Sequence, residues 1–293
     1  MKAGGGESQG RLPDFVVIGA PKCGTTSLNF YLSLHPDIHM AYPKEPCFFL
    51  DGPEFPGRWA KGVEWYRGLF RTDKKICGEA SAAYALFPSV QNVPERMAQV
   101  VPKAKLIYLV REPFARMESH FLTLHRRQAD FANLADCLAA GFETRCVAAS
   151  LYATQLERFL KFFPLKQILV LESDALLRNQ SATLRRLFEF LDVDSTFDSP
   201  LMHHRRNVTR HQPIPNNAGR KILKSGPMRF MEKVLPPSLF YHLRNIVLRP
   251  FAAEAPSLDL PESMRSFLTD KFHNEVDRLR AITGEKLPSL NKR

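Results

Sequence analysis

The chain has 293 residues, of which 44% are hydrophobic and 24% are charged. This is the composition of an ordinary globular protein, and it excludes the disordered, collagen-like and disulfide-scaffold classes. Lysine and arginine (41) exceed aspartate and glutamate (30), so the formal net charge is +11. That excess favours a polyanionic partner: a nucleotide, an acidic glycan, nucleic acid or an anionic membrane surface.

Residues 1–12 are glycine-rich and polar, so we expect a flexible N-terminal segment without the apolar stretch of a signal peptide. No apolar run approaches the ~18 residues that a membrane span needs. The five cysteines contain no CxxC pair, which argues against a zinc cluster and favours reduced thiols in a cytoplasmic protein. Cys137 and Cys146 could pair in an oxidising compartment.

Predicted strands and helices alternate along the chain. Residues 14–19 form a short segment whose centre, residues 15–18, is apolar and mostly β-branched, as in a strand buried on both faces of a parallel sheet. A turn over 20–24 leads into a helix that begins at Thr25 or Thr26. The pattern continues with a strand over 105–110, a helix from Pro113, a helix over 150–163, a strand over 167–171 and a helix over 184–191. This alternation predicts an α/β three-layer sandwich around a mainly parallel central sheet.

The C-terminal third departs from this alternation. Residues 203–227 are rich in histidine, arginine and proline, and we expect a long polar loop that borders a cleft. Helices are predicted over 229–251, with a break at Pro236-Pro237, and over 262–282. We therefore expect one domain over 13–293, with a helical C-terminal part over 228–293.

The turn after the first strand, Gly19 to Thr26 (GAPKCGTT), is typical of a phosphate-binding site. A turn from a parallel strand into a helix directs backbone N–H groups and the positive helix end to one point. Lys22 adds a positive charge there, and the two threonines add hydroxyl donors. The alternative is a tight turn with a surface lysine.

Two common nucleotide motifs do not fit this P-loop-like turn. The nucleotide-hydrolysis motif places its lysine after the second glycine, whereas Lys22 precedes Gly24. The dinucleotide fingerprint needs a glycine at position 21, which is proline. The second strand ends in Arg111, an anion ligand, rather than in the aspartate that holds magnesium in a kinase.

These segments resemble the sulfotransferases that use 3′-phosphoadenosine 5′-phosphosulfate (PAPS), in the heparan-sulfate-type and bacterial branch. Residues 21–28 (PKCGTTSL) resemble that family's 5′-phosphosulfate loop, and residues 111–119 (R-E-P-x-x-R-x-x-S) resemble its 3′-phosphate motif. Residues 44–49 (KEPCFF) resemble its K-E-x-x-F-F segment. The likeness runs from residue 13 to the C-terminus.

The resemblance implies that a sulfuryl group passes from PAPS to a hydroxyl or amine of an acceptor by in-line displacement, without a metal. Arg111 and Ser119 would bind the 3′-phosphate, with Arg220 closing over it. Glu45 would be the general base, and Lys22 would neutralise the leaving group. The residues that would hold the 5′-phosphosulfate are Lys22, Cys23, Gly24, Thr25, Thr26 and Ser27.

Two departures from the family pattern fall near the acceptor. Residues 79–84 (EASAAY) replace Glu-Lys-[TS]-Pro-x-Tyr, so the lysine is lost at Ala80. Cys47 replaces a common histidine. Both bear on the acceptor and the rate more than on PAPS binding.

The identity of the base stays open. Phe48 and Phe49 could desolvate Glu45 and raise its pKa towards neutrality, or Glu45 could simply pair with Lys44 or Lys22. A histidine is the alternative base, and the candidates are His203, His204 and His211. Glu79 is a candidate for a role at the acceptor site. Tyr152 could contact the nucleotide or lie in the core.

Two other functions compete with sulfuryl transfer: an ATP- and magnesium-dependent small-molecule kinase, and a non-enzymatic nucleotide- or nucleic-acid-binding protein. No basic and aromatic nucleic-acid motif supports the latter. The acceptor stays open among carbohydrates, lipids and secondary metabolites, as does the oligomeric state. Residues 230–251 mix apolar and basic side chains; peripheral membrane contact is conceivable, but the proline break favours ordinary packing.

Overall fold

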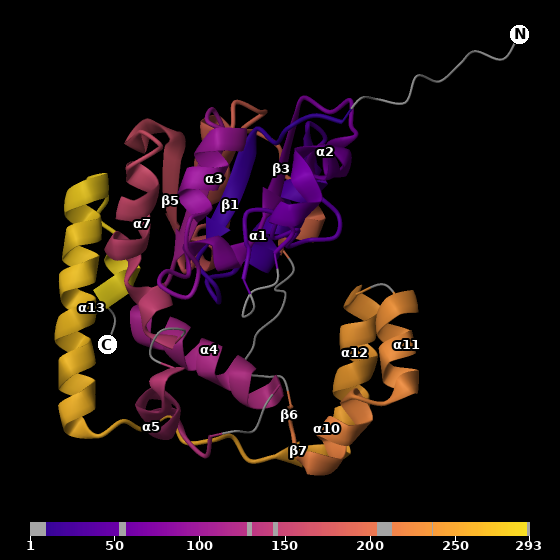
Figure 1. The fold of residues 1–293 in the computed structure, drawn as a ribbon, viewed down its shortest axis with the longest axis vertical. Coiled ribbons are helices and arrows are strands. Elements are labelled where there is room, and N and C mark those ends of the chain that lie inside the picture. Colours follow the sequence, from indigo (N-terminus) through magenta and orange to yellow (C-terminus); the bar gives the residue numbers. More distant parts are fainter. Residues whose placement is uncertain are drawn as a thin grey trace, which may run out of the picture.

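A computed structural model describes residues 10–52, 57–127, 131–142, 146–203, 213–235 and 237–291. Its centre is a five-stranded parallel sheet in the order β2-β3-β1-β4-β5 (Figure 1). The strands are β1 (Phe15–Gly19), β2 (Ile38–Met40), β3 (Ile76–Ala80), β4 (Lys105–Val110) and β5 (Ile168–Glu172). A two-stranded antiparallel pair, β6 (Ile214–Pro215) and β7 (Ala252–Ala253), lies apart from this sheet.

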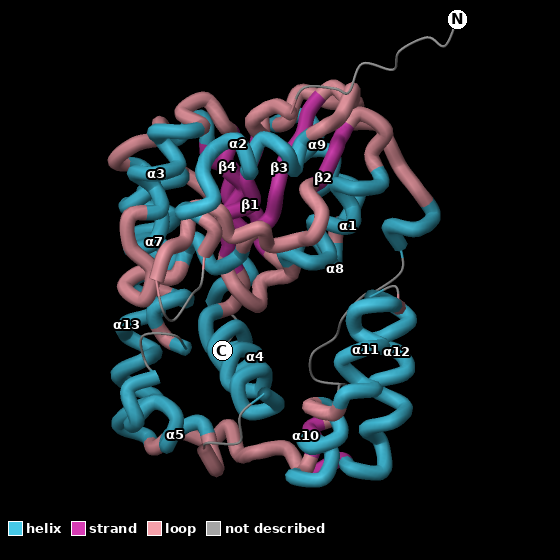
Figure 2. Tube along the Cα trace, turned by 45° about the vertical axis from the view of Figure 1, so that its right-hand side comes forward, coloured by secondary structure: helices cyan, strands magenta, loops and turns pink. Residues whose placement is uncertain are grey.

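Helices cover both faces of the sheet, which confirms the predicted three-layer α/β fold (Figures 1 and 2). On one side are α1 (Thr25–Leu34), α8 (Ala175–Arg178) and α9 (Gln180–Phe190). On the other are α3 (Val93–Val100), α7 (Tyr152–Leu160) and α13 (Glu262–Thr283). The remaining helices are α2 (Gly62–Arg67), α4 (Pro113–Arg127), α5 (Leu134–Cys137), α10 (Asn217–Leu223), α11 (Gly226–Val234) and α12 (Pro237–Leu248).

The three strands expected from apolar runs are confirmed as β1, β4 and β5, but β2 and β3 were not predicted. The sequence of β3, ICGEA, hides its strand character because it contains a glycine and a glutamate. Gly78 is required by packing: a Cβ there would lie 2.3 Å from Cζ of Phe15 on the neighbouring strand.

The prediction of a polar loop over 203–227 is wrong for most of the residues in this range that the structure describes. Residues 217–223 form α10, whose first turn is capped by the Asn216 side chain accepting from Gly219 N at 3.0 Å. The next helix, α11, begins at Gly226. Residues 204–212 lie outside the described part of the chain. The predicted helix over 229–251 is divided into α11 and α12 at the expected proline pair.

His35 and Cys137 illustrate polar and thiol groups inside the core. The His35 ring is fully buried between Phe188 and Phe197, and its Nε2 lies 3.0 Å from Asp194 O. None of the five cysteines forms a disulfide, and Cys137 is instead hydrogen-bonded to Cys146.

The long C-terminal helix is fixed to α7 by a buried carboxylate. Glu275 of α13 accepts hydrogen bonds from Thr154 N at 2.9 Å and Thr154 Oγ1 at 2.8 Å. Because Thr154 lies in the first turn of α7, Glu275 satisfies an N–H that has no acceptor within that helix. Arg278 donates to the same carboxylate at 2.5 Å.

We therefore expect Glu275→Ala to lower the free energy of unfolding by about 2–3 kcal/mol, because it removes charged hydrogen bonds to a buried helix end. Chemical denaturation measures this directly. Asp277→Ala is the control: its ion pair with Arg280 lies on the same helix, but the carboxylate is exposed, and a loss within about 0.5 kcal/mol is expected. Equal losses in the two variants would contradict the capping role.

Candidate active site

The predicted phosphate-binding turn lies at the carboxyl ends of the central strands. β1 is paired with β3 on one side and β4 on the other, and the turn over 20–24 joins β1 to α1. The connection after β1 runs towards β2 and the connection after the adjacent β4 runs towards β5, and open α/β sheets bind ligands where the connections of neighbouring strands diverge in this way.

The turn has the backbone geometry that an anion site needs. Gly24 is the N-cap of α1 and is left-handed, with φ of 91°; this conformation favours glycine. No side chain caps α1, and its first turn contains no acidic residue. The first N–H groups of a helix lack intrahelical acceptors, so the positive end of α1 can stabilise an anion.

Side chains within the turn differ in how they face the solvent. Thr25 is buried, Ser27 is half-buried and Thr26 is exposed. Cys23 is fully buried, with its N–H directed to Ala20 O at 3.2 Å and its Sγ 3.7 Å from the Tyr152 hydroxyl. Burial raises the pKa of the Cys23 thiol to about 11, so it is neutral at physiological pH. Cys23 therefore supports the turn from the core side, contrary to its expected place among the ligand contacts.

Arg111, at the end of β4, is tied to the turn. Its Nη1 donates to Lys22 O at 3.4 Å, and the Tyr152 hydroxyl donates to Arg111 O at 2.7 Å. Tyr152 is fully buried, which confirms a core position for this ring. The two predicted phosphate motifs, 89 positions apart in sequence, are thus in direct contact.

Arg116 is a site residue to which the sequence analysis gave no role. It is fully buried beneath the turn, where Nη1 donates to Pro21 O at 3.5 Å and Nε donates to Ser150 Oγ at 2.6 Å. Nη2 donates to Cys146 O. The R-E-P-x-x-R pattern contains a signal for this position of Arg116. Its second arginine follows Pro113 by three residues and therefore lies on the same face of the helix.

Ser119 lies on α4, and Arg220 contacts the same helix further along. Ser119 is nearly buried on this helix, and Arg220 of α10 donates from Nη2 to His125 O at 3.3 Å, six residues further on. Arg220 is thus on a helix rather than on the expected closing loop. Its Nε atom is buried without a hydrogen-bond partner in the described part of the chain. Burial lowers the pKa of His125, and the positive charges of Arg220 and Arg126 lower it further.

Glu45 is in the segment that follows β2 and lies beside the end of β3, where its N–H donates to Ala80 O at 3.2 Å. Its side chain is 47% exposed and forms an ion pair with Lys44, with Nζ and Oε1 2.5 Å apart. The expected desolvation of Glu45 by Phe48 and Phe49 is absent because both rings are fully buried in an aromatic cluster. Phe48 stacks on Tyr66 there, with ring centroids 4.3 Å apart. The alternative, pairing with Lys44, is the arrangement observed.

Glu79 is a fully buried carboxylate held by three hydroxyl groups. Tyr66 and Tyr84 donate to its Oε1 at 3.0 and 2.7 Å, and Ser81 donates to its Oε2 at 2.6 Å. Burial raises the pKa of Glu79 from 4.5 to about 7 although these hydrogen bonds oppose the rise.

The same hydroxyls hold the segment that contains Glu45. Cys47 N donates to Ser81 Oγ at 3.0 Å, and Phe49 N donates to Tyr84 OH at 3.5 Å. Glu79 thus orients two hydroxyls that accept from the backbone just after Glu45. The lysine expected next to Glu79 is Ala80, which is buried. Burial also raises the pKa of the Cys47 thiol to about 11, so this substitute for histidine is neutral.

Of the three histidines considered as bases, none can be placed: His204, His211 and the side chain of His203 lie outside the described part of the chain.

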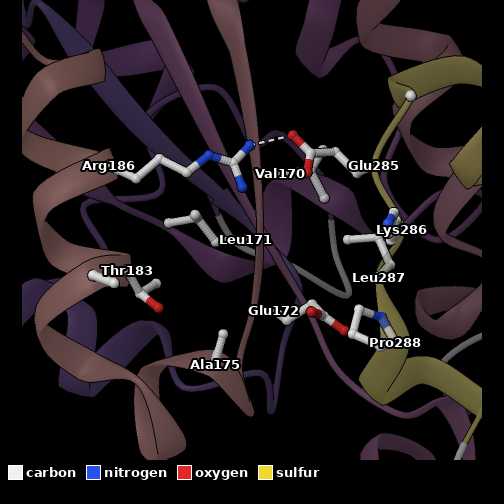
Figure 3. Close-up of a pocket in the computed structure, with 12 residues that line it drawn as sticks. Val170, Leu171, Glu172, Ala175, Thr183, Arg186, Glu285, Lys286, Leu287 and Pro288 are labelled. Atoms are coloured by element: carbon white, nitrogen blue, oxygen red, sulfur yellow. Dashed lines mark hydrogen bonds and ion pairs between the residues drawn. The ribbon is translucent and has the colours of Figure 1, made fainter.

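A cavity of about 420 Å³ lies away from this turn, between β5, α9 and the C-terminal segment 284–288 (Figure 3). Arg186 and Glu285 form an ion pair across it. Glu172 on its wall accepts from Ser289 N at 2.7 Å, which fastens the C-terminal segment to the edge strand. None of the predicted phosphate-binding residues lines this cavity.

A family model described as "Sulfotransferase domain" matches residues 12–234. The chain belongs to this sulfotransferase family. It is 28% identical over 306 residues to bifunctional heparan sulfate N-deacetylase/N-sulfotransferase 2 of Bos taurus, a match that covers 95% of the chain and 30% of that protein. It is 31% identical over 195 residues to heparan sulfate glucosamine 3-O-sulfotransferase 5 of Mus musculus, covering 62% of the chain and 54% of that protein.

Solved sulfotransferases share the fold. A sulfotransferase from Alicyclobacillus acidocaldarius aligns with a TM-score of 0.65 at 24% identity, covering 96% of this chain and all of that chain. Mouse sulfotransferase SULT7A1 complexed with PAP aligns with a TM-score of 0.51 at 16% identity, covering 94% and 91% of the two chains.

The titration of Glu79 gives a testable signature. A carboxyl with a raised pKa stabilises the folded state while it is protonated; this contribution is complete below about pH 4.5 and is lost as the pH rises to about 7. Glu79→Gln removes the titration, so its free energy of unfolding should rise relative to the parent protein by about 3 kcal/mol between pH 4.5 and 7.

Urea denaturation of both proteins across this range measures the difference. The part of the difference in free energy of unfolding that is constant with pH reflects altered hydrogen bonds. The part that changes with pH reports the titration of Glu79. A difference that does not change with pH would contradict the raised pKa. Glu64→Gln, at an exposed site, is the matched control and should show no pH dependence.

Proposed function

We propose that this protein transfers a sulfuryl group from PAPS to a hydroxyl or amine of an acceptor. The observation that carries the proposal is the uncapped N-terminus of α1, preceded by Lys22 and Gly24 and contacted by Arg111 from the neighbouring strand. Family membership supports the same reaction class. The chain spans about 30% of the N-deacetylase/N-sulfotransferase that it matches, so the proposal concerns this chain's activity only.

The residues at the turn fit a donor that carries two phosphate positions. The end of α1, with Lys22, Thr26 and Ser27, would hold the 5′-phosphosulfate. Arg111 and Ser119 would hold the 3′-phosphate, and Arg220 would reach it from α10. The bound donor supplies the sulfuryl group itself. Lys22 and the N–H groups of α1 neutralise negative charge at the 5′ position, where it grows during transfer.

Glu45 is the proposed base. Its exposed carboxylate can accept the proton of an acceptor hydroxyl or amine without first being uncovered, and Lys44 lies beside it. Glu79 acts indirectly, because Ser81 and Tyr84 connect it to the backbone that follows Glu45. We regard Glu79 as a positioning residue.

The names of the matched relatives favour a carbohydrate acceptor with free amino or hydroxyl groups. The kinase alternative is disfavoured because Arg111 occupies the strand end where such an enzyme needs a metal-binding aspartate. A cytoplasmic location, expected from the cysteines, stays a prediction.

Binding of adenosine 3′,5′-bisphosphate, the product of the donor, tests the site without an acceptor. At 100 times its dissociation constant it should add about 2.7 kcal/mol to the free energy of unfolding, without magnesium. Arg111→Ala and Lys22→Ala should each reduce this gain, whereas Arg178→Ala, at an exposed ion pair, should not. Thermal denaturation measures the shift, and stabilisation only by ATP with magnesium would favour the kinase.

Glu45→Gln separates the base from donor binding. Stabilisation by the bisphosphate should be unchanged, while turnover with labelled PAPS and de-N-sulfated heparan sulfate should fall by about 10²–10⁴-fold, the usual contribution of a general base. Lys44→Gln is the neighbouring control and should reduce turnover less. If Glu45→Gln retains near-normal turnover, the base is one of the histidines.

A further inference from the structure

The helical hairpin formed by α11 and α12 exposes large apolar side chains to solvent. The two helices lie side by side at the end of the molecule away from the central sheet (Figures 1 and 2). Phe230 is 66% exposed and Ile246 is 53% exposed, and Val234, Leu239 and Val247 are also exposed. The ordinary packing expected for residues 230–251 is therefore only partly present. Large clustered apolar exposure of this kind marks interaction surfaces.

These side chains form stripes, not scattered positions. Phe230 and Val234 are four residues apart on α11, and Leu239 and Ile246 are seven apart on α12. Met228, Phe240 and Leu248 are buried and mark the inner side of each helix. At 3.6 residues per turn, Phe230 and Val234 lie roughly opposite Met228 on α11, and Ile246 lies roughly opposite Phe240 and Leu248 on α12.

The hairpin and α10 also concentrate the positive charge of the chain. Residues 217–250 contain seven lysines or arginines and one glutamate, a net charge of +6 out of the chain's +11. Lys221, Lys224, Arg229 and Arg249 are exposed. Apolar stripes flanked by lysine and arginine are typical of helices that lie in the interface of an anionic membrane.

We propose that the α11–α12 hairpin docks on the surface of an anionic lipid bilayer. An acidic glycan would contact the cations but would leave Phe230, Val234 and Ile246 in water. A second copy of the chain would bring two positively charged surfaces together, which repel each other. In the described part of the chain, no helix is both long enough and apolar enough to cross a bilayer, and the proposed contact is peripheral. This inference does not depend on the proposed sulfuryl transfer.

Flotation with unilamellar vesicles tests the proposal. The full chain should bind vesicles of phosphatidylcholine with 30% phosphatidylserine at 0.1 M salt and should not bind phosphatidylcholine alone. Phe230→Ser with Ile246→Ser should lower the partition coefficient about tenfold or more, because both apolar anchors are lost. Arg229→Glu with Arg249→Glu should lower it comparably.

Phe267→Ser is the matched control, since Phe267 is 59% exposed on α13 and should not affect binding. Unchanged melting temperatures establish that the variants fold. The proposal is overturned if the parent protein does not bind anionic vesicles, or if binding depends on the arginines but not on Phe230 and Ile246. It is also overturned if sedimentation shows an oligomer that Phe230→Ser with Ile246→Ser dissociates, because the stripes would then face another protein chain.

Discussion

The parallel pairing of β1 with β3 and β4 is the constraint on which the site depends. All five residues of β1 are buried, so the strand is fixed by apolar contact on both faces and by ladders on both edges. The pairing brings the predicted phosphate-binding turn, the Glu79 network and Arg111 together at the carboxyl end of the strands. Gly78 makes this possible, because a larger residue would displace Phe15. The chemistry of the site thus begins with the packing of one short strand.

Two buried polar groups show how the site is supported from below. Arg116 fixes the turn by donating to backbone carbonyls of two segments, and Glu79 fixes the segment after Glu45 through hydroxyls. A buried charge is costly unless hydrogen bonds satisfy it. Three hydroxyl donors do this for Glu79, whose pKa stays raised because of its burial, while exposed Glu45 is paired with Lys44. These two neighbouring carboxylates therefore have different environments, which agrees with the different roles proposed for them.

The distribution of charge separates two surfaces of one basic protein. Part of the positive charge, including Lys22, Arg111 and Arg220, lies at the strand ends and on α10, where phosphate groups would bind. Another part lies beside exposed apolar side chains on α11 and α12. Electrostatic attraction alone does not distinguish a nucleotide from a bilayer; the apolar neighbours make that distinction.

The α/β class, strands β1, β4 and β5, and the family could be predicted from the sequence, because apolar periodicity and motif spacing are local properties. The sequence did not reveal β3, because the strand depends on pairing with β1 and β2 and its own residues have little strand propensity. It also did not reveal that Arg116 is buried beneath the turn. It also suggested that Phe48 and Phe49 cover Glu45. The folded structure shows instead that these rings pack against Tyr66 in the core and that Glu79, not Glu45, is the desolvated carboxylate. Burial depends on which segments pack together, and no local pattern in the sequence specifies those contacts.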